Sequence, residues 1–215
     1  MANKNTAGFG LIPAGQLGGT PATQGQGHYK IDAGYATALY QGSAVRLDNP
    51  GGANTNPGYI ITAQAAITND TIGVLNGVFY NAATTLKPTW QNYYNQVTPA
   101  NSEDITAFVV DSPFQLFVGA ADAAVTQANI GKSVGLTVTA AGSTTSGQSS
   151  STLTIGTIAN TANQWRLLRV AEDPENEDLT TAVQDNAALA NFSGRASVVV
   201  VVNKSQWFGT GTVGA

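Results

Sequence analysis

Thr71–Tyr94 reads TIGVLNGVFYNAATTLKPTWQNYY, and we expect the flanking segments to pair with it. Its first half predicts a strand, because the residue types between Ile72 and Tyr80 fit a pleated, half-buried surface. Gly73 and Gly77 interrupt this strand, and glycine inside a strand marks a bulge, a bend or the close approach of another backbone. The stretch therefore predicts a strongly bent strand.

The second half of the stretch carries Trp90, Tyr93 and Tyr94, with no histidine, cysteine or acidic residue among them. Pro88 lies just before this cluster and cannot donate to a ladder, which predicts an edge or loop segment. We interpret the cluster as an aromatic seam of a small β-barrel, and its chemistry favours assembly over catalysis.

The composition limits the classes of protein that the chain can belong to. Charged residues make up 10% of it, against about 25% in an average globular domain. So little charge leaves little repulsion between copies and favours association. Five of the 13 acidic residues lie in 172–178, so the rest is nearly neutral and has no basic stripe for nucleic acid. The sequence holds no cysteine, no secretory leader and no membrane-spanning apolar run.

Turn-rich segments separate short β patterns along the remaining chain, and helical periodicity is nearly absent. The candidate strands, beside the bent one, are 28–32, two within 36–48, 59–62, 105–110, 114–118, 133–139, 152–158, 164–170 and 195–202. The pair 105–118 is expected to form a hairpin across Asp111-Ser112-Pro113. The sequence therefore predicts an all-β fold, a small β-barrel or β-sandwich of roughly ten strands with an extended N-terminal arm.

Residues 1–27 are expected to form that arm, with residues 28–215 as the β-barrel or β-sandwich body. The arm is rich in glycine and lacks periodicity, yet it carries Phe9, Leu11 and Ile12. One interpretation is a disordered tail. The other is an arm that docks these three side chains on a neighbouring subunit, since free disorder favours fewer large apolar residues.

Val198–Val202 is a run of five valines and is apolar on both faces. Such a strand must be buried on both sides or covered by another chain, because an exposed apolar edge aggregates. Trp207 and Phe208 follow before a glycine-rich end. We expect the valine strand or the Trp90–Tyr94 seam to lie near a contact between copies.

The motifs for enzymatic chemistry fail on inspection. Gly209–Gly214 satisfies GxGxxG, but no helix can follow it within this sequence to bind a pyrophosphate. His28 is the sole histidine and reads as a surface or strand-start residue, with no GxSxG serine to serve. The acidic loop 172–178 lacks the spacing of an EF-hand and is interpreted as a solvated loop, a charged rim or, less favoured, a calcium site. We predict no catalytic, cofactor-binding or metal-ligating residue and no enzyme.

Several segments in order carry a family resemblance. They are MANKNTAGFG (1–10), HYKIDAGYATALYQGSAVRLD (28–48), TIGVLNGVFY (71–80), KPTWQNYY (87–94), ANIGKSVGL (128–136) and QWRLLRVAEDPENE (164–177). In these segments the chain is similar to structural proteins of marine tailed bacteriophages and resembles their capsid decoration, or cement, proteins. Residues 178–193 fit the family least well.

The resemblance implies a small β body on the outer surface of the virion, where it bridges subunits of the major capsid protein and resists DNA pressure. Its partners would be that capsid protein and copies of itself as a dimer or trimer, with no nucleic acid, membrane or cofactor. The interface residues expected are Phe9, Leu11, Ile12, Trp90, Tyr93, Tyr94, Val198, Val200, Val202, Trp207 and Phe208. The alternative is a tail or fibre module that stacks aromatics on cell-surface glycan, and a β-barrel enzyme ranks third.

Overall fold

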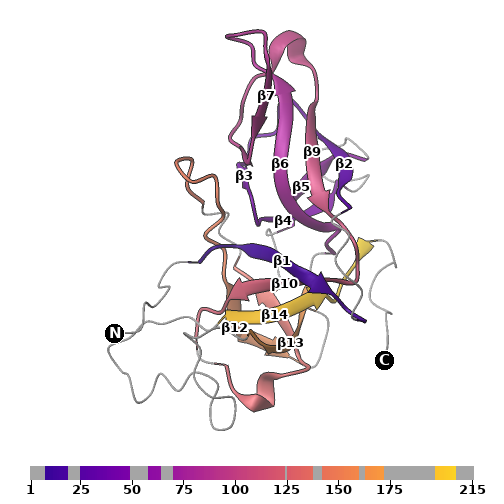
Figure 1. Cartoon of the computed structure of the whole chain (residues 1–215), viewed down its shortest axis with the longest axis vertical. Helices are drawn as coiled ribbons and strands as arrows, with labels where there is room; N and C mark the ends of the chain where they lie inside the picture. Colours follow the sequence, from indigo (N-terminus) through magenta and orange to yellow (C-terminus); the bar gives the residue numbers. More distant parts are fainter. Residues whose placement is uncertain are drawn as a thin grey trace.

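The structure is a computed structural model that describes residues 8–18, 25–48, 58–63, 70–123, 125–137, 142–159, 163–171 and 197–206. These residues form fourteen strands and two short 3₁₀ helices, arranged in three antiparallel sheets. The prediction of an all-β fold is confirmed. Figure 1 shows two lobes stacked along the long axis of the molecule, each built on one large sheet.

The lower lobe of Figure 1 is a six-stranded sheet. Its order is β1 (Leu11–Gln16), β10 (Gln115–Ala120), β14 (Ser197–Val202), β13 (Trp165–Val170), β11 (Ser133–Leu136) and β12 (Leu153–Ala159). The two edges meet at one end, where Gly10 N donates to Ser151 O at 3.2 Å and Asp122 N donates to Leu153 O at 2.9 Å. The sheet therefore curls around its own core in the manner of a small barrel.

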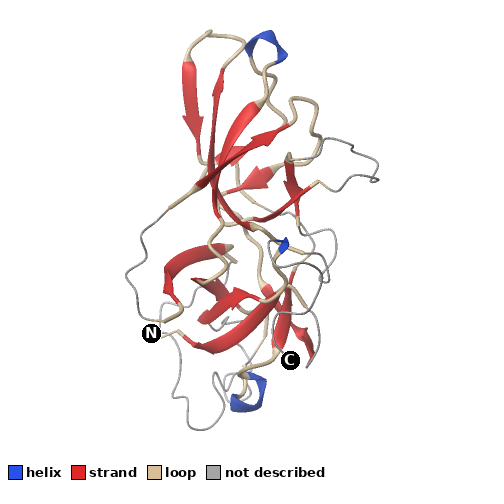
Figure 2. Cartoon of the chain, turned by 90° about the vertical axis from the view of Figure 1, so that its right-hand side faces the viewer, coloured by secondary structure: helices blue, strands red, loops and turns tan. Residues whose placement is uncertain are grey.

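The upper lobe is a second large sheet, seen from the side in Figure 2. Its order is β2 (Gly27–Ile31), β9 (Ile105–Val110), β6 (Gly73–Asn81), β4 (Ala44–Leu47) and β5 (Ile60–Thr62), with β7 (Pro88–Gln91) paired to β6. The short strands β3 (Leu39–Tyr40) and β8 (Tyr93–Tyr94) pair with each other. Strand β6 is the longest and lies in the middle of the lobe, whereas β7, which contains Pro88, pairs with β6 alone.

Each glycine of β6 has the packing reason expected from the sequence. A Cβ on Gly73 would lie 2.2 Å from the carbonyl oxygen of Val110, so only glycine lets this backbone approach so closely. Gly77 follows a register shift against β9 that begins at Leu75, which is the bulge that a glycine within a strand indicates.

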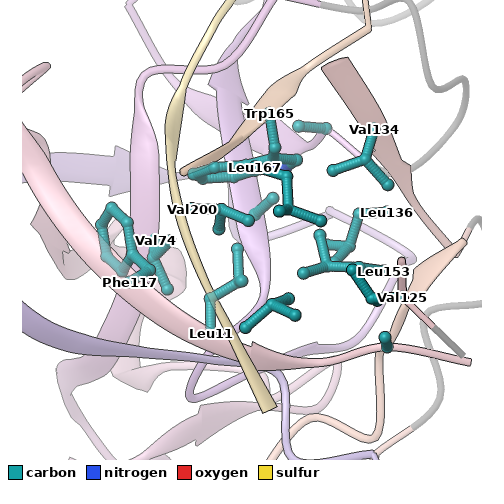
Figure 3. Close-up of a cluster of buried hydrophobic side chains, with 14 of the residues drawn as sticks. Leu11, Val74, Phe117, Val125, Val134, Leu136, Leu153, Trp165, Leu167 and Val200 are labelled. Carbon is teal, nitrogen blue, oxygen red and sulfur yellow. The ribbon is translucent and has the colours of Figure 1, made fainter. Parts of the chain in front are cut away.

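Each lobe has its own hydrophobic core. Figure 3 shows the lower core, where Leu11, Phe117, Trp165 and Val200 converge from four different strands. The upper core lies on the inner face of the second sheet and includes Ile31, Leu39, Val45, Ile60, Leu75, Val78, Tyr94, Ile105 and Val109. The two lobes touch, because Val74 and Val110 of the upper sheet pack into the lower core.

The predicted hairpin over residues 105–118 is wrong. Strands β9 and β10 do not form a hairpin: β9 pairs with β2 and β6, and β10 pairs with β1 and β14. The turn at residues 111–114 instead carries the chain from one lobe to the other. The described residues form fourteen strands against the roughly ten expected, because β1 falls in the predicted arm and β7 and β8 fall in a predicted edge or loop segment.

The segment assigned to the arm contributes a strand to this chain's own fold. Strand β1 pairs with β10, and Leu11 is 1% exposed in the lower core. In the single chain, Leu11 is therefore already surrounded by partners from its own fold, and its docking on a neighbouring subunit stays a prediction. Ile12 points to the other face and is 45% exposed.

The valine strand is buried on both faces within one chain. It forms β14, which is paired on both sides, with β10 and with β13. Val198 and Val200 lie in the core, and Val199 on the opposite face is also buried. Of the two expected arrangements, burial on both sides within the chain is the one found, and the expectation that Val198 and Val200 contact another copy is wrong for this chain, because both are fully buried and β14 is paired on both sides.

Candidate functional site: an aromatic platform on the upper sheet

The outer face of the upper sheet carries aromatic side chains from four strands. They are His28 on β2, Phe108 on β9, Phe79 on β6 and Trp90 on β7, and we call this set the aromatic platform. The register places His28 opposite Phe108, and Phe79 opposite Trp90. All four face outward because side chains alternate along a strand, and the alternate positions of these strands fill the upper core.

Trp90 is the centre of the platform. It is 51% exposed, and a Cβ on Gly77 would lie 2.5 Å from its Cζ2 atom. The indole therefore lies over the bare backbone of Gly77, an arrangement in which an aromatic ring covers a glycine left open in a sheet. The Phe108 ring supports the indole at a centroid distance of 4.9 Å and an angle of 59°. Trp90 is thus held in place while much of its surface faces solvent.

Two further side chains extend the platform on either side of Trp90. His28 meets Phe108 edge to face, with centroids 4.7 Å apart and planes at 71°. Phe79, directly opposite Trp90 in the register, is 42% exposed. Edge-to-face and tilted pairs of this kind stabilise ring orientations beyond the burial of area alone.

Polar groups border the platform at the β2 edge. Lys30 Nζ donates to Thr106 Oγ1 at 3.1 Å. In the register, Thr106 lies opposite Lys30 on one side and opposite Phe79 on the other. The surface thus combines an apolar centre with a polar pair at one edge. Exposed aromatic rings of this kind can bind a partner by stacking and burial.

The predicted seam from Trp90 to Tyr94 divides between two faces and is wrong as a single surface. Tyr94 is fully buried, stacks on Tyr35 at 6.1 Å, and donates its hydroxyl to the Tyr35 carbonyl oxygen at 2.5 Å. Burial raises the pKa of Tyr94 to about 12, with Asp32 adding to the shift. Tyr93 is half-buried and stacks on Tyr40. The reason is that β7 ends at Gln91 and the chain then turns into β8, which pairs with β3.

Sequence reasoning missed His28, Phe79 and Phe108 as parts of the site. His28 was expected to be a surface or strand-start residue, and this is confirmed, since it lies exposed on β2. Its position beside Phe108 depends on the pairing of β2 with β9. The sequence did hold one signal. His28 and Lys30 are two positions apart on one strand, as are Thr106 and Phe108 on another, so each pair is expected to share a face.

The remaining predicted contact residues lie elsewhere. Phe9 and Ile12 line a cavity of about 130 Å³ between the lobes. Val202 ends β14 and is half-buried. Trp207 and Phe208 lie outside the described residues, as does the acidic loop 172–178.

Across the described ranges, no three histidine, cysteine, aspartate or glutamate side chains cluster as a metal site would require. In the same residues, no helix has the length and apolar character needed to span a membrane. Comparisons of the chain with protein-family models, with curated proteins and with solved structures find no match.

Proposed function

We propose that this protein is a virion structural protein that decorates and stabilises the outer surface of an icosahedral phage head by bridging major capsid subunits. The observation that carries the proposal is the aromatic platform: Trp90 lies exposed outside two complete hydrophobic cores. A large aromatic ring fixed at the surface adds nothing to either core. Its burial against a partner is where it contributes free energy, and tryptophan is enriched among the residues that dominate contact sites.

The composition supports the packing of many copies side by side on a shell. With 10% charged residues and a net charge of −4, copies repel one another weakly when they are packed on a shell. A platform held by β-strands loses little conformational freedom on binding. Many modest contacts repeated over a shell then add up to high avidity.

The rival function is a tail or fibre module that binds cell-surface glycan. It predicts that Trp90 and Tyr94 are exposed together on one face. Trp90 is exposed, which suits sugar stacking, but Tyr94 is fully buried and can contact no ligand. Decoration of the head therefore remains the function that we propose.

The first test is to measure the location and copy number of the protein in purified particles by cryo-electron microscopy and mass spectrometry. The proposal expects density on the outer face of the head and a copy number in fixed proportion to the major capsid protein. A few copies at the tail, together with binding to a glycan array, would indicate the fibre module. Absence from the particle would overturn both proposals.

The second test addresses the platform. Trp90→Ala is added to particles that lack the protein, and Phe114→Ala is the control, because Phe114 is 56% exposed on the lower lobe. We expect Trp90→Ala to reduce the bound copy number at least tenfold and Phe114→Ala to leave it unchanged. Equal retention of both variants would show that the platform is not the contact.

A further inference from the structure

Strand β1 is the N-terminal edge of the lower sheet, and its partners come from distant parts of the chain. It pairs along one side with β10, and Gln115 Nε2 donates to the Gly15 carbonyl oxygen at 2.7 Å across 100 residues of sequence. Leu17 N adds a bond to Phe114 O at 2.8 Å. The docking of β1 is therefore a long-range event that needs the rest of the lobe to exist first.

A specific socket receives Leu11. A Cβ on Gly119 would lie 2.9 Å from Leu11 Cδ2, so the glycine leaves the space that the leucine fills. On the other side, Leu11 N donates to the Gly42 carbonyl oxygen at 3.0 Å. The socket thus recognises both the backbone and the side chain of β1, and another copy of the same strand would fit it equally well.

Beyond Leu11, the ladder of β1 is interrupted. A cavity of about 130 Å³ runs beside it, lined by Phe9, Leu11 and Ile12. Pro13 has no N–H to donate, and the pairing shifts register between Pro13 and Gly15. Leu11 is the one large side chain of β1 that is fully buried. One buried side chain, an interrupted ladder and the hydrogen bonds at Gly15 and Leu17 therefore attach this strand to the lobe.

We propose that β1 exchanges between copies, so that β1 of one chain occupies the socket beside β10 of a second copy. Residues 17–26 join β1 to β2 and can span roughly 35 Å when extended. The exchanged strand makes every contact that it makes within its own chain, which is why strand exchange is an inexpensive route to a dimer. This inference does not depend on the proposed function.

The protein concentration decides whether β1 binds within its own chain or in a second copy. Because only residues 17–26 join β1 to β2, the strand has an effective concentration in the millimolar range for its own socket. Dilute protein is therefore closed on itself, and exchange grows as copies are crowded. The ratio of exchanged dimer to monomer should rise about tenfold for each tenfold increase in protein concentration.

The test uses the absence of cysteine from the sequence. Ile12 and Val118 are register partners on β1 and β10, so the double variant Ile12→Cys/Val118→Cys places two thiols at disulfide spacing. The protein is refolded over a concentration series from micromolar to millimolar, oxidised mildly and separated on a non-reducing gel. We expect monomers with an internal disulfide at low concentration and dimers linked between chains at high concentration.

The matched control keeps Val118→Cys and moves the second cysteine to Val199, its register partner on β14. Strand β14 is paired on both sides, so this disulfide should stay within one chain at every concentration. Internal disulfides alone in the Ile12→Cys/Val118→Cys variant, up to millimolar protein, would overturn the proposal. Dimers of equal yield in the control would do the same, because they would come from random collision.

A second measurement needs no cysteine. Deletion of residues 19–24 shortens the connection and should favour exchange, since short hinge segments promote swapping. Light scattering should then show a dimer, and adding Leu11→Ala should return it to a monomer by removing the anchor. A deletion variant that folds and stays monomeric at millimolar concentration would also count against exchange.

Discussion

Two tryptophans of this chain occupy opposite environments although each one packs on a phenylalanine. Trp165 in the lower lobe is fully buried and meets Phe117 edge to face, with centroids 5.6 Å apart at 81°. Trp90 in the upper lobe meets Phe108 at 4.9 Å and 59°, yet half of it is exposed. The ring pairs are similar in geometry, and what differs is the face of the sheet on which they lie.

The difference teaches that position on a sheet, not residue type, decides whether a tryptophan of this protein fills a core or stays exposed to solvent. On the inner face, Trp165 fills the core that Figure 3 shows. On the outer face, Trp90 covers Gly77 and presents the rest of its ring to solvent. Substitutions in the two places should therefore change different measured quantities.

The largest effect is expected in the lower core. Trp165→Ala should reduce the free energy of unfolding by about 3–5 kcal/mol, because it leaves a large cavity in a closed core. Trp165→Phe should cost clearly less, since Trp165 Nε1 has no hydrogen-bond acceptor among the described residues and the phenylalanine removes that buried donor. Urea unfolding measures both, and equal losses would contradict the expectation that the buried N–H of Trp165 is a cost that phenylalanine removes.

The next largest effect separates the two faces of a single strand. Leu11→Ala should lower the free energy of unfolding by about 3 kcal/mol, because Leu11 is 1% exposed. Ile12→Ala, its neighbour on the outer face, should cost less than about 1 kcal/mol. The same denaturation assay compares them. A large loss for Ile12→Ala would mean that the outer face of β1 is covered in solution.

Much of this architecture could be predicted from the alternation and turn signals of the sequence. The strands around Ile105–Val110 and Trp165–Val170 lie within a residue or two of the expected bounds. The bend of β6 was predicted from its two glycines, and the structure shows the close approach at Gly73 and the bulge at Gly77. Local backbone geometry of this kind can be predicted, because it requires a glycine at the position itself.

The partners of each strand could not be predicted in the same way. Alternation shows which residues share a face, but nothing local in β9 and β10 says that they belong to different sheets. The platform depends on that non-local information, because His28 reaches Phe108 only through the pairing of β2 with β9. The split between Trp90 and Tyr94 likewise follows from a strand ending at Gln91.

A smaller effect is expected at Tyr94, the buried end of the stretch that was predicted to form an aromatic seam. Tyr94→Phe removes the hydroxyl donated to the Tyr35 carbonyl oxygen and should cost about 1 kcal/mol near pH 7. Because burial raises the pKa of Tyr94 to about 12, against about 10 in an unfolded chain, the folded state keeps the proton longer. The wild-type contribution is therefore complete below pH 10 and is lost as the pH rises towards 12.

The free energy of unfolding, measured between pH 8 and 12, checks the direction of this pH dependence. The free energy of unfolding of Tyr94→Phe should fall less steeply above pH 10 than that of the wild type. Some slope will remain, because the pKa values of Tyr35 and Tyr80 are also raised by burial. Identical slopes in the two proteins would mean that Tyr94 ionises as freely when folded as when unfolded.

The smallest change in stability should come with a clear change at the platform. Gly77 does not have a positive φ, so its backbone accepts alanine, and such a substitution stabilises a chain by about 0.4–1 kcal/mol when nothing clashes. Here the added Cβ would lie 2.5 Å from Trp90 Cζ2 and 2.9 Å from the Gln91 carbonyl oxygen on β7. The indole must lift away from the sheet and the edge strand β7 must shift by a few tenths of an ångström, so the net loss in the free energy of unfolding should be about 1 kcal/mol.

The displaced indole provides the measurement. In a Trp165→Phe/Trp207→Phe background, the emission of Trp90 should shift towards that of a solvated indole in Gly77→Ala. Gly156→Ala is the matched control, because a Cβ there meets nothing within 4 Å. An unchanged Trp90 spectrum in Gly77→Ala would show that the ring does not lie over Gly77. A shifted spectrum with weakened particle binding would instead tie recognition to the orientation of this one ring, since the cores on the inner faces are untouched.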